Sequence, residues 1–134
     1  MKNFTFKYEM EVRDYECDIQ GVVNNSVYQN YLEHTRHQYL KSIDLDFAEL
    51  QEKGINLMVT RVEIDYKSPL RSSDKFISAV RMERISPLRF GFVQQINRKS
   101  DNKLIIKALV IGTSVNERGR PELHEDLIKV WGIE

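Results

Sequence analysis

The feature that most constrains the fold is a long helical repeat that follows directly after a turn-forming stretch. Apolar side chains recur at helical spacing between residues 27 and 39, with polar and charged side chains between them; they are Val27, Tyr28, Tyr31, Leu32, Thr35 and Tyr39. Three residues of helix-capping type come immediately before, at Asn24, Asn25 and Ser26. The pattern predicts a long helix, one face of which needs a second layer to cover it.

A carboxylate precedes this helix. Asp18 lies in a turn upstream of Asn25, and Gly21 between them can bend the chain without steric cost. The first turn of a helix offers unpaired N–H donors and a partial positive charge, which suit a carbonyl oxygen that becomes an oxyanion. We therefore predict that the start of the helix faces the neighbourhood of Asp18.

The rest of the chain reads mainly as strands. Alternating or continuous apolar runs predict strands over residues 4–12, 55–66, 75–85, 89–98 and 104–115, the last covered on both faces. A change of phase near Thr60 and Arg61 predicts a bulge. Short helices are expected within 43–53, ended by Gly54, and over 124–131. Short connections favour an antiparallel sheet of about five strands with the long helix across it, an α+β fold in one domain over 1–134.

Composition excludes several classes of function. Lys plus Arg and Asp plus Glu number 20 each, so no overall field recruits nucleic acid or an anionic membrane. No apolar run approaches the ~18 residues of a membrane span, and the N-terminus lacks the apolar region of a signal peptide. The single cysteine, Cys17, excludes an internal disulfide, and we expect a cytoplasmic protein.

The region around the helix start carries a motif that resembles a known family. The residues are Asp18-x-x-Gly21-Val22-Val23-x-Asn25-x-x-Tyr28-x-x-Tyr31-x-Glu33-x-x-Arg36, followed in the sheet by Arg89-Phe90-Gly91-Phe92-Val93-Gln94. This pattern resembles hotdog-fold thioesterases of the 4-hydroxybenzoyl-CoA thioesterase type. That group includes bacterial acyl-CoA thioesterases, 1,4-dihydroxy-2-naphthoyl-CoA hydrolases and plant plastid acyl-acyl-carrier-protein thioesterases. The local sequence around Asp18 is most similar to that of the plant branch.

The resemblance implies a fold, an assembly and an activity. It implies a hotdog fold with a long central helix on a curved antiparallel sheet, in homodimers or homotetramers with the active site between subunits. It implies hydrolysis of an acyl-CoA thioester without metal or organic cofactor. Asp18 would act as nucleophile or general base in a partly desolvated cleft, Asn25 and its neighbouring amides as oxyanion donors beside Gly21, and Arg89 as a ligand of the CoA phosphates.

Each of these residues also has a structural interpretation. Asp18 would cap a turn, Asn25 would cap the helix, and Gly21 would be an ordinary turn glycine. Arg84, Arg98, Lys99 and Lys103 could join Arg89 in one phosphate-binding basic rim, and the structural alternative for all five is solvated surface charge. Phe90, Phe92 and residues 104–111 would line an acyl pocket or belong to an ordinary core.

Other polar residues of the helix are assigned structural roles. Tyr28, Tyr31 and Tyr39 are predicted core residues with satisfied hydroxyls, and Glu33 with Arg36 a polar pair at the surface or at an interface. His34 and His37 lack further ligands for a metal site, and they lie too far along the helix for the histidine of a hotdog dehydratase. The alternatives to acyl-CoA hydrolysis are the same chemistry on acyl-acyl-carrier-protein and a non-catalytic acyl-thioester binding protein.

Overall fold

The structure is a computed structural model that describes residues 1, 3–45 and 47–134, apart from the side chain of Phe47. Its elements in chain order are β1 (Phe6–Glu11), the 3₁₀ turn η1 (Asp14–Glu16), α1 (Asn25–Ser42), α2 (Phe47–Glu52), β2 (Asn56–Tyr66), β3 (Lys75–Ser86), β4 (Arg89–Arg98), β5 (Leu104–Val115) and α3 (Glu125–Trp131). The predicted elements are therefore confirmed, and the predicted strand over 4–12 shortens to β1.

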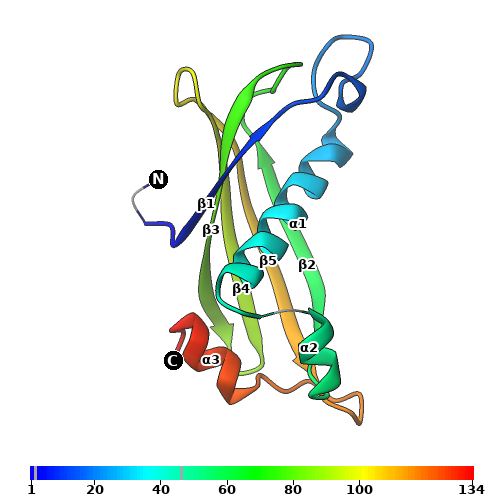
Figure 1. The fold of residues 1–134 in the computed structure, drawn as a ribbon, viewed down its shortest axis with the longest axis vertical. Coiled ribbons are helices and arrows are strands. Elements are labelled where there is room, and N and C mark those ends of the chain that lie inside the picture. The colour runs from blue at the N-terminus through cyan, green and yellow to red at the C-terminus, as the bar shows by residue number, and fades with distance from the viewer. Residues whose placement is uncertain (2, 46) are drawn as a thin grey trace.

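The strands form one antiparallel sheet in the order β1-β3-β4-β5-β2, so β1 and β2 are its edges. Figure 1 shows α1 lying across one face of this curved sheet, where it packs mainly on β3 and β1. The Asp18 loop and the start of α1 are at the upper end in this view, and α2 and α3 are at the lower end. The α+β hotdog architecture is as predicted.

The core lies between the sheet and the helices, in two clusters. The cluster nearer the start of α1 includes Leu32, Phe76 and Ile106, and the cluster nearer its end includes Phe90 and Trp131. The helix tyrosines are buried as predicted, with Tyr28 at 2% exposure. The strand over 104–115 is an interior strand, but Lys107 on β5 is exposed, so its cover is less complete than predicted.

The predicted bulge is present on β2. The register against β5 shifts between Val59 and Arg61, and the Thr60 hydroxyl donates a hydrogen bond to the Ile111 carbonyl at 3.2 Å. Gly112, opposite Val59, allows the two strands to approach: a Cβ there would lie 2.7 Å from the Met58 carbonyl oxygen and 2.9 Å from the Phe90 ring. The change in the alternation of apolar residues near Thr60 therefore marks a bulge, and this bulge packs against a glycine of the neighbouring strand.

We expect Gly112→Ala to lower the free energy of unfolding by about 1 to 3 kcal/mol, because the backbone oxygen of Met58 cannot move away without disturbing the bulge. Urea unfolding measures the change. Gly119→Ala isolates the other cost of such a change: nothing lies within 4 Å of a Cβ there, but its φ of +76° is unfavourable for alanine, so any loss of stability reports backbone strain rather than crowding. Equal stability of Gly112→Ala and wild type would contradict the close approach.

Candidate active site

Asp18 begins a tight hairpin. The Asp18 N–H donates to the Val22 carbonyl at 2.9 Å, and the Gly21 N–H donates to the Asp18 carbonyl at 2.9 Å. The Asp18 carboxylate accepts through Oδ1 from the amides of Gln20 at 2.8 Å and Val22 at 3.4 Å. Gly21 has a φ of +78°, the left-handed conformation that closes such a three-residue loop. Nothing lies within 4 Å of a Cβ at Gly21, so the turn itself explains this glycine.

The returning arm of the hairpin leads straight into α1. Cys17 pairs with Val23, and the Asn24 N–H donates to the Glu16 carbonyl at 3.1 Å, after which the helix begins at Asn25. Asn24 takes the cap position, but its side chain makes no capping hydrogen bond. Within the described part of the chain, the amides of Asn25 and Ser26 therefore keep their N–H groups free, as the first turn of a helix does.

Asp18 and Gly21 thus lie in one tight hairpin, and Asn25 lies at the start of the helix that follows it. Asp18 stands opposite Val22, and two or three extended residues separate Val22 from the first helical amides. At the rise of an extended chain, the first helical amides lie roughly 7 to 10 Å from Val22. Asp18 and Asn25 are both exposed in the single chain, so the desolvated cleft expected around the carboxylate is not completed by this chain alone.

Two buried tyrosines fix the hairpin on the helix. The Tyr31 hydroxyl donates to Glu16 Oε1 at 2.8 Å, and Glu16 Oε1 also accepts from the Arg13 amide at 2.8 Å. Burial, followed by the contact with Glu16, raises the pKa of Tyr31. The Tyr28 hydroxyl accepts from the Leu70 amide at 2.9 Å, and burial raises its pKa as well. Glu16, which sequence reasoning missed, therefore ties the turn before Asp18 to α1.

A hollow of about 260 Å³ lies at the start of α1. It is lined by Val22, Val23, Asn25, Tyr28, Tyr66, Lys67, Ser68 and Pro69. The ring of Tyr66, at the end of β2, lies 5.8 Å from that of Tyr28, and its hydroxyl reaches the Asn25 carbonyl at 3.5 Å. The helix start and the end of the edge strand β2 therefore form the two walls of this hollow.

Arg89 is not part of this arrangement. It begins β4 and pairs with Ser86, at the turn between β3 and β4, whereas Asp18 lies at the other end of the sheet, beside the chain that precedes β3. Figure 1 shows this separation between the lower and upper ends of the molecule. Arg89 and Asp18 of one chain therefore cannot contact the same small group.

The predicted basic rim is also divided between these ends, so the prediction of a single rim is wrong. Arg84 lies near Arg89, where its guanidinium donates to the carbonyls of Ser86 and Pro87. At the opposite end, Arg98 forms ion pairs with Asp74 and Asp101, and Lys99 with Glu9; Lys103 follows there, just before β5.

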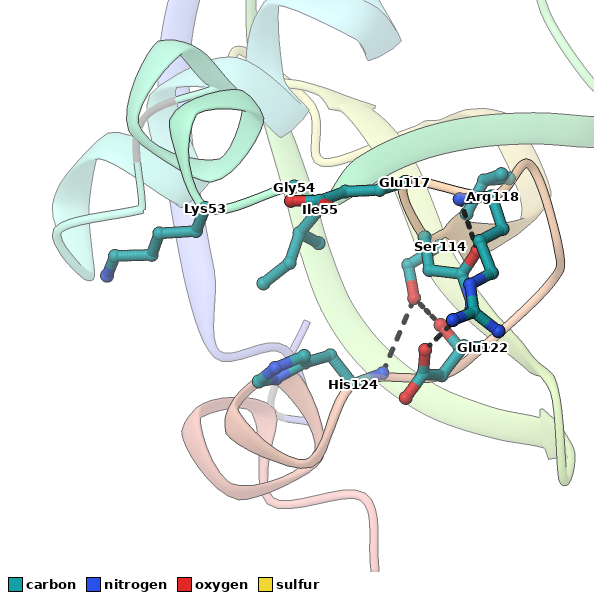
Figure 2. A pocket seen from close by; sticks show the side chains of 10 residues that line it. Lys53, Gly54, Ile55, Ser114, Glu117, Arg118, Glu122 and His124 are labelled. Atoms are coloured by element: carbon teal, nitrogen blue, oxygen red, sulfur yellow. Dashed lines mark hydrogen bonds between the residues drawn. The ribbon is translucent and has the colours of Figure 1, made fainter.

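A larger hollow, about 360 Å³, lies between the end of α2, the start of β2 and the connection from β5 to α3 (Figure 2). Its polar groups mostly bond one another: the Ser114 hydroxyl donates to the Glu122 carbonyl, and the His124 amide donates to Ser114 Oγ at 3.4 Å. Lys53 and Arg118 are balanced in its lining by Glu117 and Glu122. We place the candidate active site at Asp18 because its Oδ2 and the first amides of α1 have no partner among the described residues, whereas the polar groups of this hollow bond one another and hold a loop.

Glu33 and Arg36 do not form the predicted pair. Glu33 lies 3.9 Å from His37, while the Arg36 guanidinium donates to Gln94 Oε1 at 3.1 Å. His34 packs edge-on against Tyr8. Among the residues that the structure describes, no group of three or more His, Cys, Asp or Glu side chains could hold a metal ion, and no helix is long and apolar enough to cross a membrane.

Comparison with known proteins decides the family. The family model described as "Thioesterase-like superfamily" matches residues 12–130. The chain belongs to this superfamily. The matched range contains the Asp18 hairpin, α1 and all strands except β1, so the likeness includes the whole candidate active site.

The sequence relatives of this thioesterase-like chain come from plants and bacteria. "Acyl-acyl carrier protein thioesterase ATL3, chloroplastic" from Arabidopsis thaliana is 38% identical over 113 residues, 84% of this chain and 60% of the relative. A "Putative esterase" from Aquifex aeolicus is 31% identical over 87 residues, 65% of this chain and 68% of the relative. The chain thus spans about 60% of the length of the plant relative.

Solved structures agree on the fold. A hypothetical protein from Aquifex aeolicus superposes with a TM-score of 0.84 at 25% identity, over 94% of this chain and 98% of the other. A 1,4-dihydroxy-2-naphthoyl-CoA thioesterase from Synechocystis superposes with a TM-score of 0.85 over 92% of each chain, at 18% identity. These neighbours share the helix-on-sheet arrangement of the thioesterase-like chain.

Proposed function

We propose that this protein hydrolyses an acyl-CoA thioester to the free acid and CoA, with Asp18 as nucleophile or general base. The observation that carries this proposal is the hairpin that joins Asp18 to α1. Two amides hold Oδ1 of Asp18, Oδ2 has no protein partner among the described residues, and the free amides of Asn25 and Ser26 follow a few residues later in the chain. A carboxylate and an oxyanion site are what thioester hydrolysis requires.

Either mechanism uses the same groups. As a nucleophile, Asp18 forms a bond from carboxylate oxygen to the carbonyl carbon, the C–S bond breaks, and the thiolate takes up a proton. Water then hydrolyses the mixed anhydride and restores the carboxylate. As a general base, Asp18 takes a proton from water as the water oxygen attacks the carbonyl carbon; the C–S bond then breaks, and the proton passes from Asp18 to the leaving thiolate, which restores the carboxylate. In both, the amides at the start of α1 stabilise the developing oxyanion, an effect worth about 3 kcal/mol per donor.

The alternative substrate is an acyl-acyl-carrier-protein, which the name of the plant relative supports. Lys67 lines the hollow at the start of α1, and Arg71 pairs with Val22 of the hairpin. Both are exposed, and within the described chain neither side chain forms an ion pair with a carboxylate. These cations suit the phosphates of CoA and the acidic surface of a carrier protein alike.

Thiol release from matched acyl-CoA and acyl-carrier-protein thioesters tests the proposal. We expect hydrolysis of at least one series, and the larger kcat/KM identifies the carrier of the acyl group. Binding of the thioesters without turnover would instead support a non-catalytic binding protein, and neither binding nor turnover would reject both functions.

We also propose that the working unit is a homodimer, or a tetramer of such dimers, joined through β2. Among the described residues this strand has no neighbour on its outer side, and it exposes Met58, Val59, Val62 and Tyr66. A long apolar edge strand is a template for pairing with another chain. A second copy there would also cover the open side of the hollow beside Tyr66.

Val62→Lys is expected to raise the dissociation constant of the dimer at least about tenfold, because it places a charge on the pairing edge. Sedimentation velocity across a concentration series measures the change. Val130→Lys is the matched control: Val130 on α3 is 42% exposed, close to the 41% of Val62, but lies away from β2. An unchanged mass distribution for Val62→Lys would reject the edge as the interface.

A further inference from the structure

Arg36 is a half-buried cation on α1 that forms no ion pair with a carboxylate of the described residues, although the charge of Glu33 acts on it from a greater distance. Its guanidinium donates to Gln94 Oε1 at 3.1 Å and lies 5.7 Å from the centre of the Phe92 ring. No carboxylate of the described residues comes within ion-pair distance of it, and burial lowers its pKa. Burying a charge without pairing it costs free energy, so the remaining N–H donors favour a further acceptor.

Arg36 lines a hollow of about 230 Å³ between α1, β2 and β4. Its walls are apolar, formed by Leu57, Met58, Val59, Phe90 and Phe92, and its polar groups come from Glu33, Arg36 and His37. Apolar walls with a few placed polar groups are typical of a site that binds a mainly apolar ligand and recognises one polar group on it.

This hollow is in line with the candidate active site. From Asn25 to Arg36 the helix makes about three whole turns, so both residues lie on nearly the same side of α1. Tyr66 of β2 meets this side near Asn25, and Leu57, Met58 and Val59 of β2 line the hollow near Arg36. The distance along the axis is about 16 Å, and the Arg36 side chain leans back toward the helix start. An extended acyl chain of roughly ten to twelve carbons would span that distance.

We propose that Arg36 forms the far end of the acyl site and selects acyl groups of this length that carry an oxygen at their distal end. The proposal rests on the proposed function, because it places the thioester carbonyl at Asn25. The guanidinium donates to the distal oxygen, and the nearby Glu33 carboxylate disfavours an anionic tip. The fitting tip is therefore a neutral hydroxyl or carbonyl, and an unsubstituted chain of the same length leaves the donors unpaired.

The test compares two CoA esters of equal length, ω-hydroxydodecanoyl-CoA and dodecanoyl-CoA. We expect the wild-type protein to prefer the hydroxylated ester in kcat/KM by about tenfold or more, as a hydrogen bond to a charged group allows. Arg36→Met removes the donors and is expected to abolish or reverse that preference. Arg36→Gln retains two donors without the charge and should fall between the two.

Arg81→Met is the matched control, because Arg81 also lies over a phenylalanine ring, 6.0 Å from the centre of Phe4, but on β3, outside this hollow. The Arg81→Met variant should prefer the hydroxylated ester to the same extent as the wild type. Should Arg36→Met fail to fold, Arg36→Gln decides the question.

Three results would overturn the proposal. If a folded Arg36 variant keeps the wild-type preference for the hydroxylated ester, Arg36 does not bind the distal oxygen of the acyl group, while the thioesterase function stands. An unchanged preference together with a loss of dimer shows that Arg36 binds a carboxylate of a second copy instead. Absence of thioester hydrolysis by the wild type removes the proposed function, and this inference with it.

Discussion

Asp18→Asn is expected to lower kcat for thioester hydrolysis by about 10² to 10⁴-fold while leaving the thermal melting midpoint close to that of the wild type. The amide oxygen of asparagine can still accept the bonds from Gln20 and Val22, so the hairpin keeps its shape. What is lost is the carboxylate that attacks the thioester or takes a proton from water. The pair of measurements separates chemistry from folding.

The matched control is Asp14→Asn, four positions earlier in η1. Asp14 is also exposed, and its carboxylate bonds the Ser72 hydroxyl rather than facing the start of α1. We expect it to retain activity within a few-fold of the wild type. Equal rates for Asp18→Asn and the wild type would assign Asp18 to the turn alone, because that role survives the substitution.

The parts of the site that could be predicted from the sequence are those close together along the chain. Asp18, Gly21 and Asn25 lie within one hairpin and the helix that follows, so turn and capping preferences already place them together. The bulge at Thr60 could likewise be read from a change of phase within one strand.

The contacts that the sequence did not predict join distant segments. The bond from Arg36 to Gln94 connects residues 58 positions apart, whereas the family pattern suggested Glu33 as the partner of Arg36. Glu16 resembles any surface carboxylate until the fold places the Tyr31 hydroxyl against it. Arg89 matched a family position, but its distance from Asp18 depends on the length of the sheet and on any second copy.

Asp18 is exposed in the single chain, which is a physical reason to expect that a second chain completes the site. Water screens the charge of a carboxylate in open solvent, and a thioester bound there would remain hydrated. The carboxylate would therefore accelerate hydrolysis less than it would in a cleft that excludes water. A second copy on β2 would lie against the hollow formed by Tyr66 and the start of α1. We therefore expect Val62→Lys to lower activity together with dimer content, in proportion to the fraction of monomer.

Phe76→Ala is expected to give the largest loss of stability, about 3 to 5 kcal/mol in the free energy of unfolding. Phe76 is 0% exposed on β3, and its ring lies 4.7 Å from that of Tyr31. The cavity left by truncation opens where α1 packs on the sheet, and the neighbours cannot fill it because Ile96 and Ile106 are already fully buried.

Urea unfolding monitored by circular dichroism measures this change, and Leu88→Ala in the turn between β3 and β4 is the control. Leu88 is 47% exposed, so its truncation should change stability by no more than about 0.5 kcal/mol. Because Tyr31 also holds Glu16 and through it the hairpin, Phe76→Ala should lower thioesterase activity at temperatures where the domain is still folded. A loss below 1 kcal/mol would show that helix and sheet repack freely, and the active-site hairpin would then have no rigid support.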